Sequence, residues 1–184
     1  MLKKIIFKFL NFFMSFFFSK EYLKGRWFSG LTGYNWCFKT IVHCRLLRLG
    51  KNYPFPASHK VRISNWKKIY FDPEDIALFQ SEGCYFQNFS ANIYIGKGTF
   101  IAPNVGLITA NHDLTDLKKH LPGKDIIIGE RCWIGMNSVL LPGVKLADGI
   151  IVGAGSVVTK SFDEPGVIVC GNPAKILRAV NEKS

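Results

Sequence analysis

The sequence predicts a mainly β protein whose central part is a parallel β-helix of six-residue repeats. From residue 128 to residue 163, every sixth residue is a branched aliphatic, and the residue that follows it is usually small. The aliphatic positions are Ile128, Ile134, Leu140, Leu146, Val152 and Val158. A period of six fits neither an α-helix, with about 3.6 residues per turn, nor a β-meander, and it is the period of a β-helix built from hexapeptides.

The six-residue period has a simple physical interpretation. Each repeat forms one short strand and one tight corner, and three repeats complete a triangular coil, so equivalent residues stack at intervals of about eighteen residues. The aliphatic side chain points into the coil, while a small residue such as Gly129 or Gly135 lets the backbone turn at the corner. Stacked coils satisfy one another's backbone groups, as in other solenoids.

A second run with the same period lies upstream, and the gap between the two runs predicts an inserted loop. The second run consists of Phe89, Ile95, Ile101 and Leu107. Leu107 and Ile128 are 21 residues apart, which is not a multiple of six. If the repeat that begins at Leu107 closes at His112, residues 113–127 form an inserted loop with the polar composition of an exposed segment. Long ordered loops are usually functional, which makes this insertion a candidate site.

The segments around the repeats divide the chain into three parts. Residues 1–52 are basic and aromatic, and a helix is expected from Cys37 to Leu49. Residues 53–163 form the β-helix with the loop 113–127, and its first coils are expected to be irregular because a terminal coil caps the stack. In residues 164–184 we expect a strand near residues 167–170, followed by a turn and a short C-terminal helix.

The first nineteen residues predict an amphipathic helix on a membrane surface. Their polar residues are three or four positions apart and form one narrow stripe of a helix, which Phe, Leu, Ile and Met otherwise cover. The stripe consists of Lys4, Lys8, Asn11, Ser15 and Ser19. The apolar run is too short to span a bilayer, which favours an interfacial helix on the cytoplasmic leaflet. A signal or anchor segment and a helix that packs within an oligomer are the alternatives.

The charge distribution also indicates an anionic partner for the N-terminal part. The net charge is +11; residues 1–70 hold 14 Lys or Arg against one acidic residue, and residues 71–184 hold 10 against 12. Nothing resembles a base-reading module, so an anionic membrane is expected rather than nucleic acid. The five cysteines are widely spaced and form no CxxC pair, which indicates free thiols in a reducing compartment and a cytoplasmic, peripheral location.

Several motifs in the C-terminal half carry a family resemblance. They are Ile95-Gly96-Lys97-Gly98-Thr99, Asn111-His112-Asp113, Cys132-Trp133-Ile134-Gly135, Gly153-Ala154-Gly155 and Gly171-Asn172-Pro173-Ala174-Lys175. Together they resemble the hexapeptide-repeat acyltransferases, a left-handed β-helix family that includes galactoside and maltose acetyltransferases and polysaccharide O-acetyltransferases. The resemblance implies a homotrimer that transfers an acetyl group from acetyl-CoA to a sugar hydroxyl in surface polysaccharide or glycan biosynthesis. The membrane-surface helix suits an acceptor carried on a lipid. No acyl-enzyme is expected, because no cysteine or serine is paired with His112 in any motif.

The resemblance also assigns roles to individual residues. His112 is implied as the general base, and the backbone at Gly135-Met136 as the donor to the oxyanion and thioester. Met136 stands where many sugar acetyltransferases carry Ser, so no hydroxyl is offered there. The implied acceptor-binding residues are Gln87, Asn88, Asn111 and Asp113, with His120 as a further candidate. The implied acetyl-CoA-binding residues are Trp133, Gly153, Ala154, Thr159, Lys160, Pro173, Lys175 and Arg178.

Other readings of these residues stay open. The Gly153-Ala154-Gly155 run also suits turn geometry alone, and Lys160, Lys175 and Arg178 also suit a solvated surface. An N-acetyltransferase of an amino sugar or nucleotide sugar, or a non-catalytic β-helix scaffold, would show similar repeats. A carbonic anhydrase of this fold needs three histidines around zinc, and no third histidine accompanies His112 and His120 in the repeats, so no metal is expected.

Overall fold

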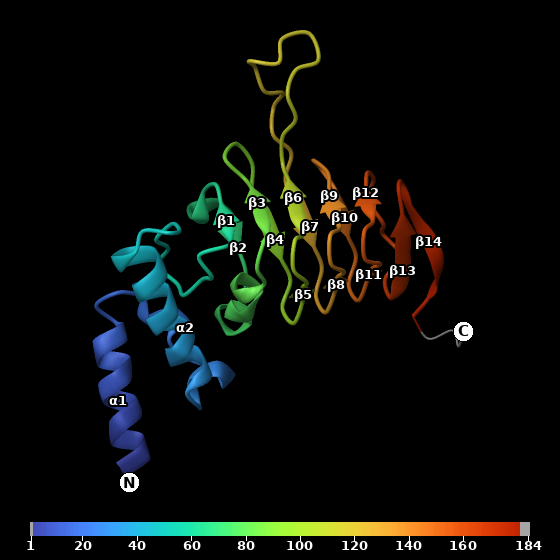
Figure 1. Ribbon diagram of the computed structural model, residues 1–184. Helices are drawn as coiled ribbons and strands as arrows, with labels where there is room; N and C mark the ends of the chain where they lie inside the picture. The colour runs from blue at the N-terminus through green and yellow to red at the C-terminus, as the bar shows by residue number, and fades with distance from the viewer. Residues whose placement is uncertain (1, 181–184) are drawn as a thin grey trace. The chain divides into compact units, whose positions relative to one another are not determined.

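A computed structural model describes residues 2–180 of the chain (Figure 1). The chain divides into two compact units: unit 1 comprises Met1–Val61 and Pro73–Glu82, and unit 2 comprises Arg62–Asp72 and Gly83–Ser184. Unit 1 is helical and unit 2 is built mainly from short strands, so the predicted combination of a β-helix with a helical N-terminal segment is confirmed.

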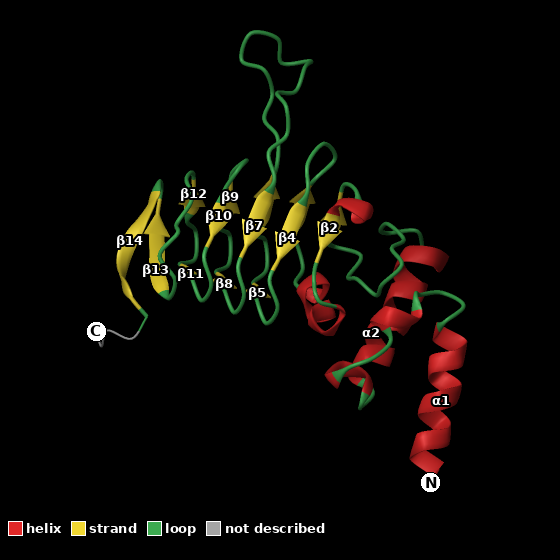
Figure 2. Ribbon diagram, turned by 180° about the vertical axis from the view of Figure 1, so that it is seen from behind, coloured by secondary structure: helices red, strands yellow, loops and turns green. Residues whose placement is uncertain are grey.

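Unit 2 is a prism with three sheets, as Figures 1 and 2 show. One sheet contains β1 (Arg62–Ile63), β3 (Tyr85–Gln87), β6 (Gly106–Ile108), β9 (Val139–Leu140) and β12 (Val157–Val158). The second contains β2 (Ile69–Tyr70), β4 (Ile93–Ile95), β7 (Ile126–Ile128) and β10 (Lys145–Leu146). The third contains β5 (Phe100–Ile101), β8 (Trp133–Ile134), β11 (Ile151–Val152), β13 (Val167–Gly171) and β14 (Ala174–Ala179). Neighbouring strands are parallel except for the pair β13 and β14, as expected for stacked coils.

The register of the strands confirms both the repeat and the size of the insertion. Ile134 pairs with Val152, eighteen residues later, and the same interval separates Leu140 from its partner Val158. Ile101 instead pairs with Ile134, 33 residues later, which is fifteen more than the regular interval. The six aliphatic residues from Ile128 to Val158 are all buried, so each one points into the prism.

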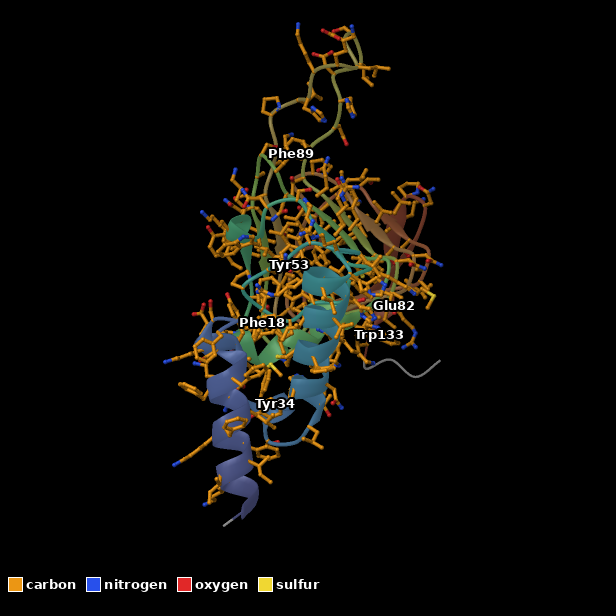
Figure 3. All side chains as sticks on the ribbon, turned by 60° about the vertical axis from the view of Figure 1, so that its left-hand side comes forward. Phe18, Tyr34, Tyr53, Glu82, Phe89 and Trp133 are labelled. Carbon is orange, nitrogen blue, oxygen red and sulfur yellow. The ribbon has the colours of Figure 1, made fainter. Side chains whose placement is uncertain are left out.

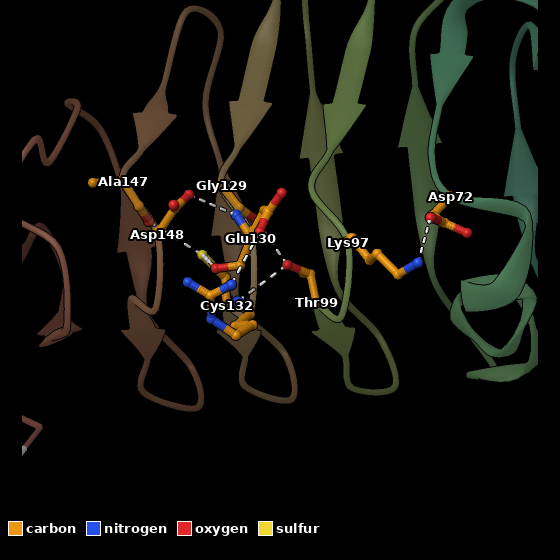
Figure 4. Close-up of polar contacts among 9 residues, drawn as sticks. Asp72, Lys97, Thr99, Gly129, Glu130, Cys132, Ala147 and Asp148 are labelled. Carbon is orange, nitrogen blue, oxygen red and sulfur yellow. Dashed lines mark hydrogen bonds and ion pairs between the residues drawn. The ribbon is translucent and has the colours of Figure 1, made fainter.

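Polar contacts at one corner of the prism join consecutive coils (Figure 4). The Thr99 hydroxyl donates to the Gly129 carbonyl at 2.8 Å and accepts from the Cys132 backbone N–H at 3.1 Å. One coil further on, the Asp148 carboxylate accepts from the Glu130 backbone N–H at 2.8 Å. These bonds satisfy backbone groups that the turn leaves unpaired, and they therefore help to hold the coils in register.

The inserted loop leaves the prism between β6 and β7 and extends away from it (Figures 1 and 2). The loop was expected at 113–127, but Ile126 and Ile127 already belong to β7 and the Ile126 side chain is fully buried. Backbone bonds tie its base together: Leu121 N–H donates to the Asn111 carbonyl and Lys124 N–H to the Thr109 carbonyl, each at 2.8 Å. The loop therefore begins and ends about two residues earlier than the repeat count predicts.

Two further expectations for unit 2 are wrong. Phe86, not Phe89, pairs with Leu107 and fills the prism, because the first coils are longer than eighteen residues; Phe89 is 40% exposed. The expected C-terminal helix is also absent from the described residues, where β14 pairs antiparallel with β13. A turn at Gly171, whose φ is +102°, reverses the chain, and β14 pairs with backbone groups that β13 would otherwise leave unpaired at the sheet edge.

Unit 1 contains α1 (Leu2–Met14), η1 (Lys20–Tyr22), η2 (Arg26–Phe28), α2 (Thr32–Thr40), the π-helix η3 (Ile41–Leu46) and η5 (Pro73–Gln80); a further short helix, η4 (Trp66–Lys68), lies in unit 2. The helix expected over residues 37–49 starts five residues earlier and ends at Leu46. Phe18 and Tyr34, labelled in Figure 3, belong to a buried cluster with Met14, Leu23, Phe28 and Cys37. None of the helices in residues 2–180 has the length and hydrophobicity needed to cross a bilayer.

Candidate active site

His112 lies at the base of the inserted loop and is exposed. Its Nδ1 atom is 2.7 Å from the carbonyl oxygen of Leu117, within the same loop. Because a carbonyl oxygen only accepts hydrogen bonds, Nδ1 must carry the proton, and Nε2 then carries the lone pair. In the neutral imidazole, this contact therefore leaves Nε2 as the nitrogen that can accept a proton.

A second imidazole stands beside His112. The ring centroids of His112 and His120 are 4.2 Å apart, and the two residues form an antiparallel bridge across the loop. Phe89 packs edge-on against His120 with the centroids 4.9 Å apart. Phe89, which the repeat pattern assigns to the core, therefore supports the ring that neighbours the candidate base.

Gln87 supports the strand that leads to His112. Its Oε1 atom accepts from the backbone N–H groups of Thr109 and Ala110, and its Nε2 atom donates to the Ala110 carbonyl, all at 3.0 Å. The amide oxygen and one amide N–H are therefore bonded to backbone groups two to three residues before His112. These bonds support a positioning role for Gln87, while the second Nε2 hydrogen is left for the expected contact with the acceptor, which stays a prediction.

The other expected acceptor residues differ in their environments. Asn88 is fully buried, and its amide exchanges two hydrogen bonds with the backbone of Asn65, so it offers nothing to an acceptor in this chain. Asn111 is exposed beside His112. The Asp113 carboxylate accepts from the Thr115 hydroxyl and backbone N–H, which lowers its pKa, so it stays ionised while it closes a turn of the loop.

An apolar groove of about 320 Å³ runs along the third sheet. Its walls include five residues expected at the acetyl-CoA site: Trp133, Gly135, Met136, Gly153 and Ala154. A Cβ atom on Gly135 would lie 2.6 Å from the Val152 carbonyl oxygen, so this position has no room for a side chain. The backbone N–H of Met136 donates to no acceptor among the described residues and is therefore available to an oxyanion.

Ala102 also lines the groove, and the repeat pattern missed it. The signal is present in the sequence, since Ala102 follows Ile101 as Gly135 follows Ile134 and Gly153 follows Val152. Backbone bonds stack these positions: Ala102 N–H donates to the Ile134 carbonyl at 2.9 Å, and Gly135 N–H to the Val152 carbonyl at 2.8 Å. Small residues at one position in three successive coils leave the space that forms the groove.

The remaining predicted residues lie away from the groove walls. Thr159 and Lys160 are exposed after β12, Pro173 is exposed in the turn between β13 and β14, and Lys175 is exposed on β14. Arg178 is partly buried, and its guanidinium donates to the Ala179 carbonyl at 3.3 Å. His112 is likewise not among the residues that line the groove of the same chain.

Metal binding and covalent catalysis by a thiol are two other chemistries that concern this region. The described residues contain no group of three His, Cys, Asp or Glu side chains that could hold a metal ion. Cys132 precedes Trp133 of the groove, but burial raises the pKa of its thiol, which is held at 3.2 Å from the Ala147 carbonyl. A buried thiol with a raised pKa is a poor nucleophile.

Residues 125–160 match the family model described as bacterial transferase hexapeptide (six repeats). The protein named "Putative colanic acid biosynthesis acetyltransferase WcaF" of Escherichia coli is 32% identical over 71% of this chain and 68% of its own length. The galactoside O-acetyltransferase of Escherichia coli is 35% identical over 54% of this chain and 53% of its own length. The chain spans about half the length of several other curated relatives, among them a Saccharomyces cerevisiae protein of which it covers 48%.

A solved structure agrees with these sequence matches. A hexapeptide-repeat acetyltransferase of Vibrio cholerae, in complex with acetyl coenzyme A, is 32% identical with a TM-score of 0.50, over 54% of this chain and 55% of that one. The repeat register, the groove and these relatives together lead to one conclusion. The chain belongs to the hexapeptide-repeat acetyltransferase family, whose fold is the left-handed β-helix.

Proposed function

We propose that the protein is an acetyl-CoA-dependent O-acetyltransferase that modifies a sugar hydroxyl in surface polysaccharide or glycan biosynthesis. The observation that carries the proposal is the Nδ1 contact of His112 with the Leu117 carbonyl, which leaves Nε2 as a base at the surface of the loop. Relatives whose names include galactoside and colanic acid acetyltransferases support a sugar acceptor.

In this proposal the site residues act on a donor that supplies an acetyl thioester. His112 Nε2 removes the proton of the sugar hydroxyl as its oxygen attacks the thioester carbonyl, which contributes about 10²–10⁴ in rate. The free N–H of Met136 stabilises the negative charge that develops on the carbonyl oxygen. The apolar groove beside Met136 holds the extended arm of the donor, and the proton on His112 finally passes to the leaving sulfur. No acyl-enzyme is needed.

We further propose that the protein is a homotrimer in which His112 of one chain serves the groove of its neighbour. The arrangement is supported by the absence of His112 from the walls of its own groove. Large apolar side chains on the outer faces of the sheets support it too, among them the stacked pair Tyr70 and Tyr94 and the exposed Phe100 and Trp133.

The acetyl-transfer proposal is tested by thiol release from acetyl-CoA against a panel of soluble glycans. His112→Ala should lower kcat about 10²–10⁴-fold with an unchanged melting temperature, because the exposed side chain supports catalysis rather than the core. Lys118→Ala, an exposed change in the same loop, is the matched control and should retain activity. Full activity in the His112→Ala protein would refute the assigned base.

We also propose that unit 1 attaches to the anionic inner face of a membrane. One face of α1 contributes Met14 to the buried cluster of unit 1, whereas six large apolar side chains of the same segment are 45% to 68% exposed. They are Ile5, Ile6, Phe9, Phe12, Phe13 and Phe16. The exposed Lys4, Lys8, Lys20 and Lys24 provide the positive charge that an anionic lipid surface attracts.

Because α1 is part of the core of unit 1, point substitutions test this proposal better than truncation. Replacing Phe9, Phe12 and Phe16 by Ser should abolish sedimentation with phosphatidylglycerol vesicles while circular dichroism stays unchanged. Replacing Leu114, Leu117 and Leu121 by Ser, three exposed residues of the inserted loop, is the matched control and should not alter sedimentation. Equal vesicle binding by both triple variants would contradict the proposed surface.

A further inference from the structure

Unit 1 contains a polar cavity of about 220 Å³ that the acetyl-transfer chemistry does not use. Three segments form its walls: α2 with Trp36 and Lys39, the π-helix with His43, and the segment that carries His59. Gln80, the last residue of η5, and Glu82 complete the lining. All of these residues belong to unit 1.

Hydrogen bonds between the segments fix the shape of the cavity. The buried Thr40 hydroxyl accepts from the Ala57 backbone N–H at 3.1 Å and lies 2.9 Å from the Ala57 carbonyl, which joins α2 to the segment before His59. Gln80 Nε2 donates to the Pro56 carbonyl at 3.0 Å, and Ser58 N–H donates to the Phe79 carbonyl at 2.8 Å. The cavity is therefore preorganised, which lowers the cost of binding a ligand.

The π-helix supplies a second observation. Residues Ile41–Leu46 are π-helical, and Leu47 N–H donates to the Val42 carbonyl at 2.9 Å, five residues back. Such segments are rare and occur frequently at functional sites, because the wider turn redirects the side chains within it. His43 lies in this turn and lines the cavity.

Three of the donors that line the cavity make no hydrogen bond or salt bridge among residues 2–180. The ring centroids of His43 and His59 are 4.6 Å apart. The ring nitrogens of both residues make no hydrogen bond with any other residue in the range 2–180. The Lys39 ammonium likewise forms no salt bridge in that part of the chain. Two adjacent imidazoles and an ammonium group together offer several N–H donors from different walls.

The charges around the cavity favour an anion. Lys60 donates to the Glu82 carboxylate at 2.7 Å, and this bond together with the charges of Lys60, His59 and Lys39 lowers the pKa of Glu82. Glu82 thus stays ionised and forms its salt bridge with Lys60, so the ammonium group of Lys39, which is in no salt bridge among residues 2–180, adds a second positive charge to the cavity wall.

We propose that this cavity binds a phosphate ester group, carried either by a soluble nucleotide or by a lipid. A tetrahedral phosphate presents several oxygens to donors that come from different directions, as Lys39, His43 and His59 do. The indole of Trp36 forms an apolar wall for the group to which the phosphate is attached. The site does not depend on the proposed sugar acetylation.

The test is a calorimetric titration of the full-length protein with inorganic diphosphate at constant ionic strength. The wild type should bind one equivalent per chain. Lys39→Gln and the double variant His43→Gln/His59→Gln should each weaken binding at least about tenfold, whereas Lys51→Gln, an exposed lysine of the same unit, should change it less than about twofold. No saturable binding by the wild type, or equal affinity of Lys39→Gln and Lys51→Gln, would overturn the proposal.

Two further arms distinguish the sources of the phosphate. Displacement of diphosphate by uridine diphosphate would assign a soluble nucleotide. Stronger sedimentation with vesicles that contain a polyprenyl diphosphate than with phosphatidylglycerol vesicles, lost in Lys39→Gln, would assign a lipid. Failure of both sources to compete with inorganic diphosphate would overturn the phosphate ester assignment. Lys39 is exposed, so the Lys39→Gln result decides the matter even if the double histidine variant unfolds.

Discussion

At the scale of single residues, two neighbouring residues of the groove have different surroundings, so substitutions at them should have different effects on ligand binding and on stability. Ala154 and Gly153 both line the groove, but only Ala154 has a side chain, and that residue is exposed. A Cβ atom on Gly153 would lie 2.9 Å from the Cβ atom of Cys170, so enlargement there strains the coil as well. Substitutions at Ala154 and Gly153 therefore allow an effect on ligand affinity to be distinguished from an effect on stability.

Ala154→Leu should raise the Kd for acetyl-CoA at least about tenfold with little change in melting temperature, because the larger side chain fills the groove and not the core. Gly153→Leu should weaken binding and also destabilise the protein by about 1–3 kcal/mol. Titration calorimetry and thermal melts of the two variants check this. Equal losses of binding and stability in Ala154→Leu would show that the small residues serve turn geometry alone.

The buried cysteines predict a loss of stability at high pH. Burial raises the pKa of Cys37 to about 12, above its ordinary value of 9.0. Its stabilising contribution is present in full below pH 9.0 and is lost as the pH rises through the folded-state pKa of about 12. Urea unfolding between pH 8 and pH 11 should show this decline, and Cys37→Ala should make it shallower. An identical decline in Cys37→Ala would contradict this cause.

Some site residues were within reach of sequence reasoning and others were not. The small residues of the groove follow the aliphatic at a fixed step, so the repeat alone places Gly135 and Gly153 on one face. The roles of Gln87 and Asn88 depend on which backbone groups their amides meet, and those groups belong to segments more than twenty residues away. The ring contact of Phe89 with His120 depends on the path of the inserted loop, which no period describes.

At the scale of elements, the six-residue period predicts the strands of the regular coils but not the structure of the segments at either end of the prism. The two coils from Ile128 onward follow the eighteen-residue interval on all three sides, because each aliphatic must meet its equivalent in the next coil. The first coils and the C-terminal segment have a neighbour on one side only. There, sheet-edge pairing decides the structure, and β14 forms a strand where a helix was expected.

The register also predicts that the inserted loop can be removed without loss of the fold. Deleting residues 111–125 would join Ala110 to Ile126 and bring every interval in the central coils to eighteen residues, since the insertion accounts for the fifteen extra residues. We expect the deleted protein to keep its β-sheet circular dichroism and a cooperative thermal transition, and to lose acetyl transfer together with His112. A chain that fails to fold would show that the loop stabilises the prism.

At the scale of the whole molecule, the separation of base and groove points to a site shared between chains. His112 projects on a loop that leaves the prism, whereas the groove lies along the third sheet of the same chain. In the proposed homotrimer, each loop would serve the groove of the next chain, so every site would take its parts from two chains. A variant with a damaged loop and a variant with a damaged groove should therefore restore activity when they assemble into the same trimer.

Co-expression of His112→Ala chains with Ala154→Leu chains tests the shared site. In random mixed trimers, a site is intact when an Ala154→Leu chain supplies His112 and a His112→Ala chain supplies the groove, which is expected in about one quarter of sites. Each variant alone should show only residual thiol release from acetyl-CoA, while the mixture should recover about a quarter of the wild-type rate. Mixing the two variants after separate purification is the control and should give no recovery until the chains exchange. If co-expressed chains form trimers by native mass spectrometry and still show no recovery, each site is built within a single chain.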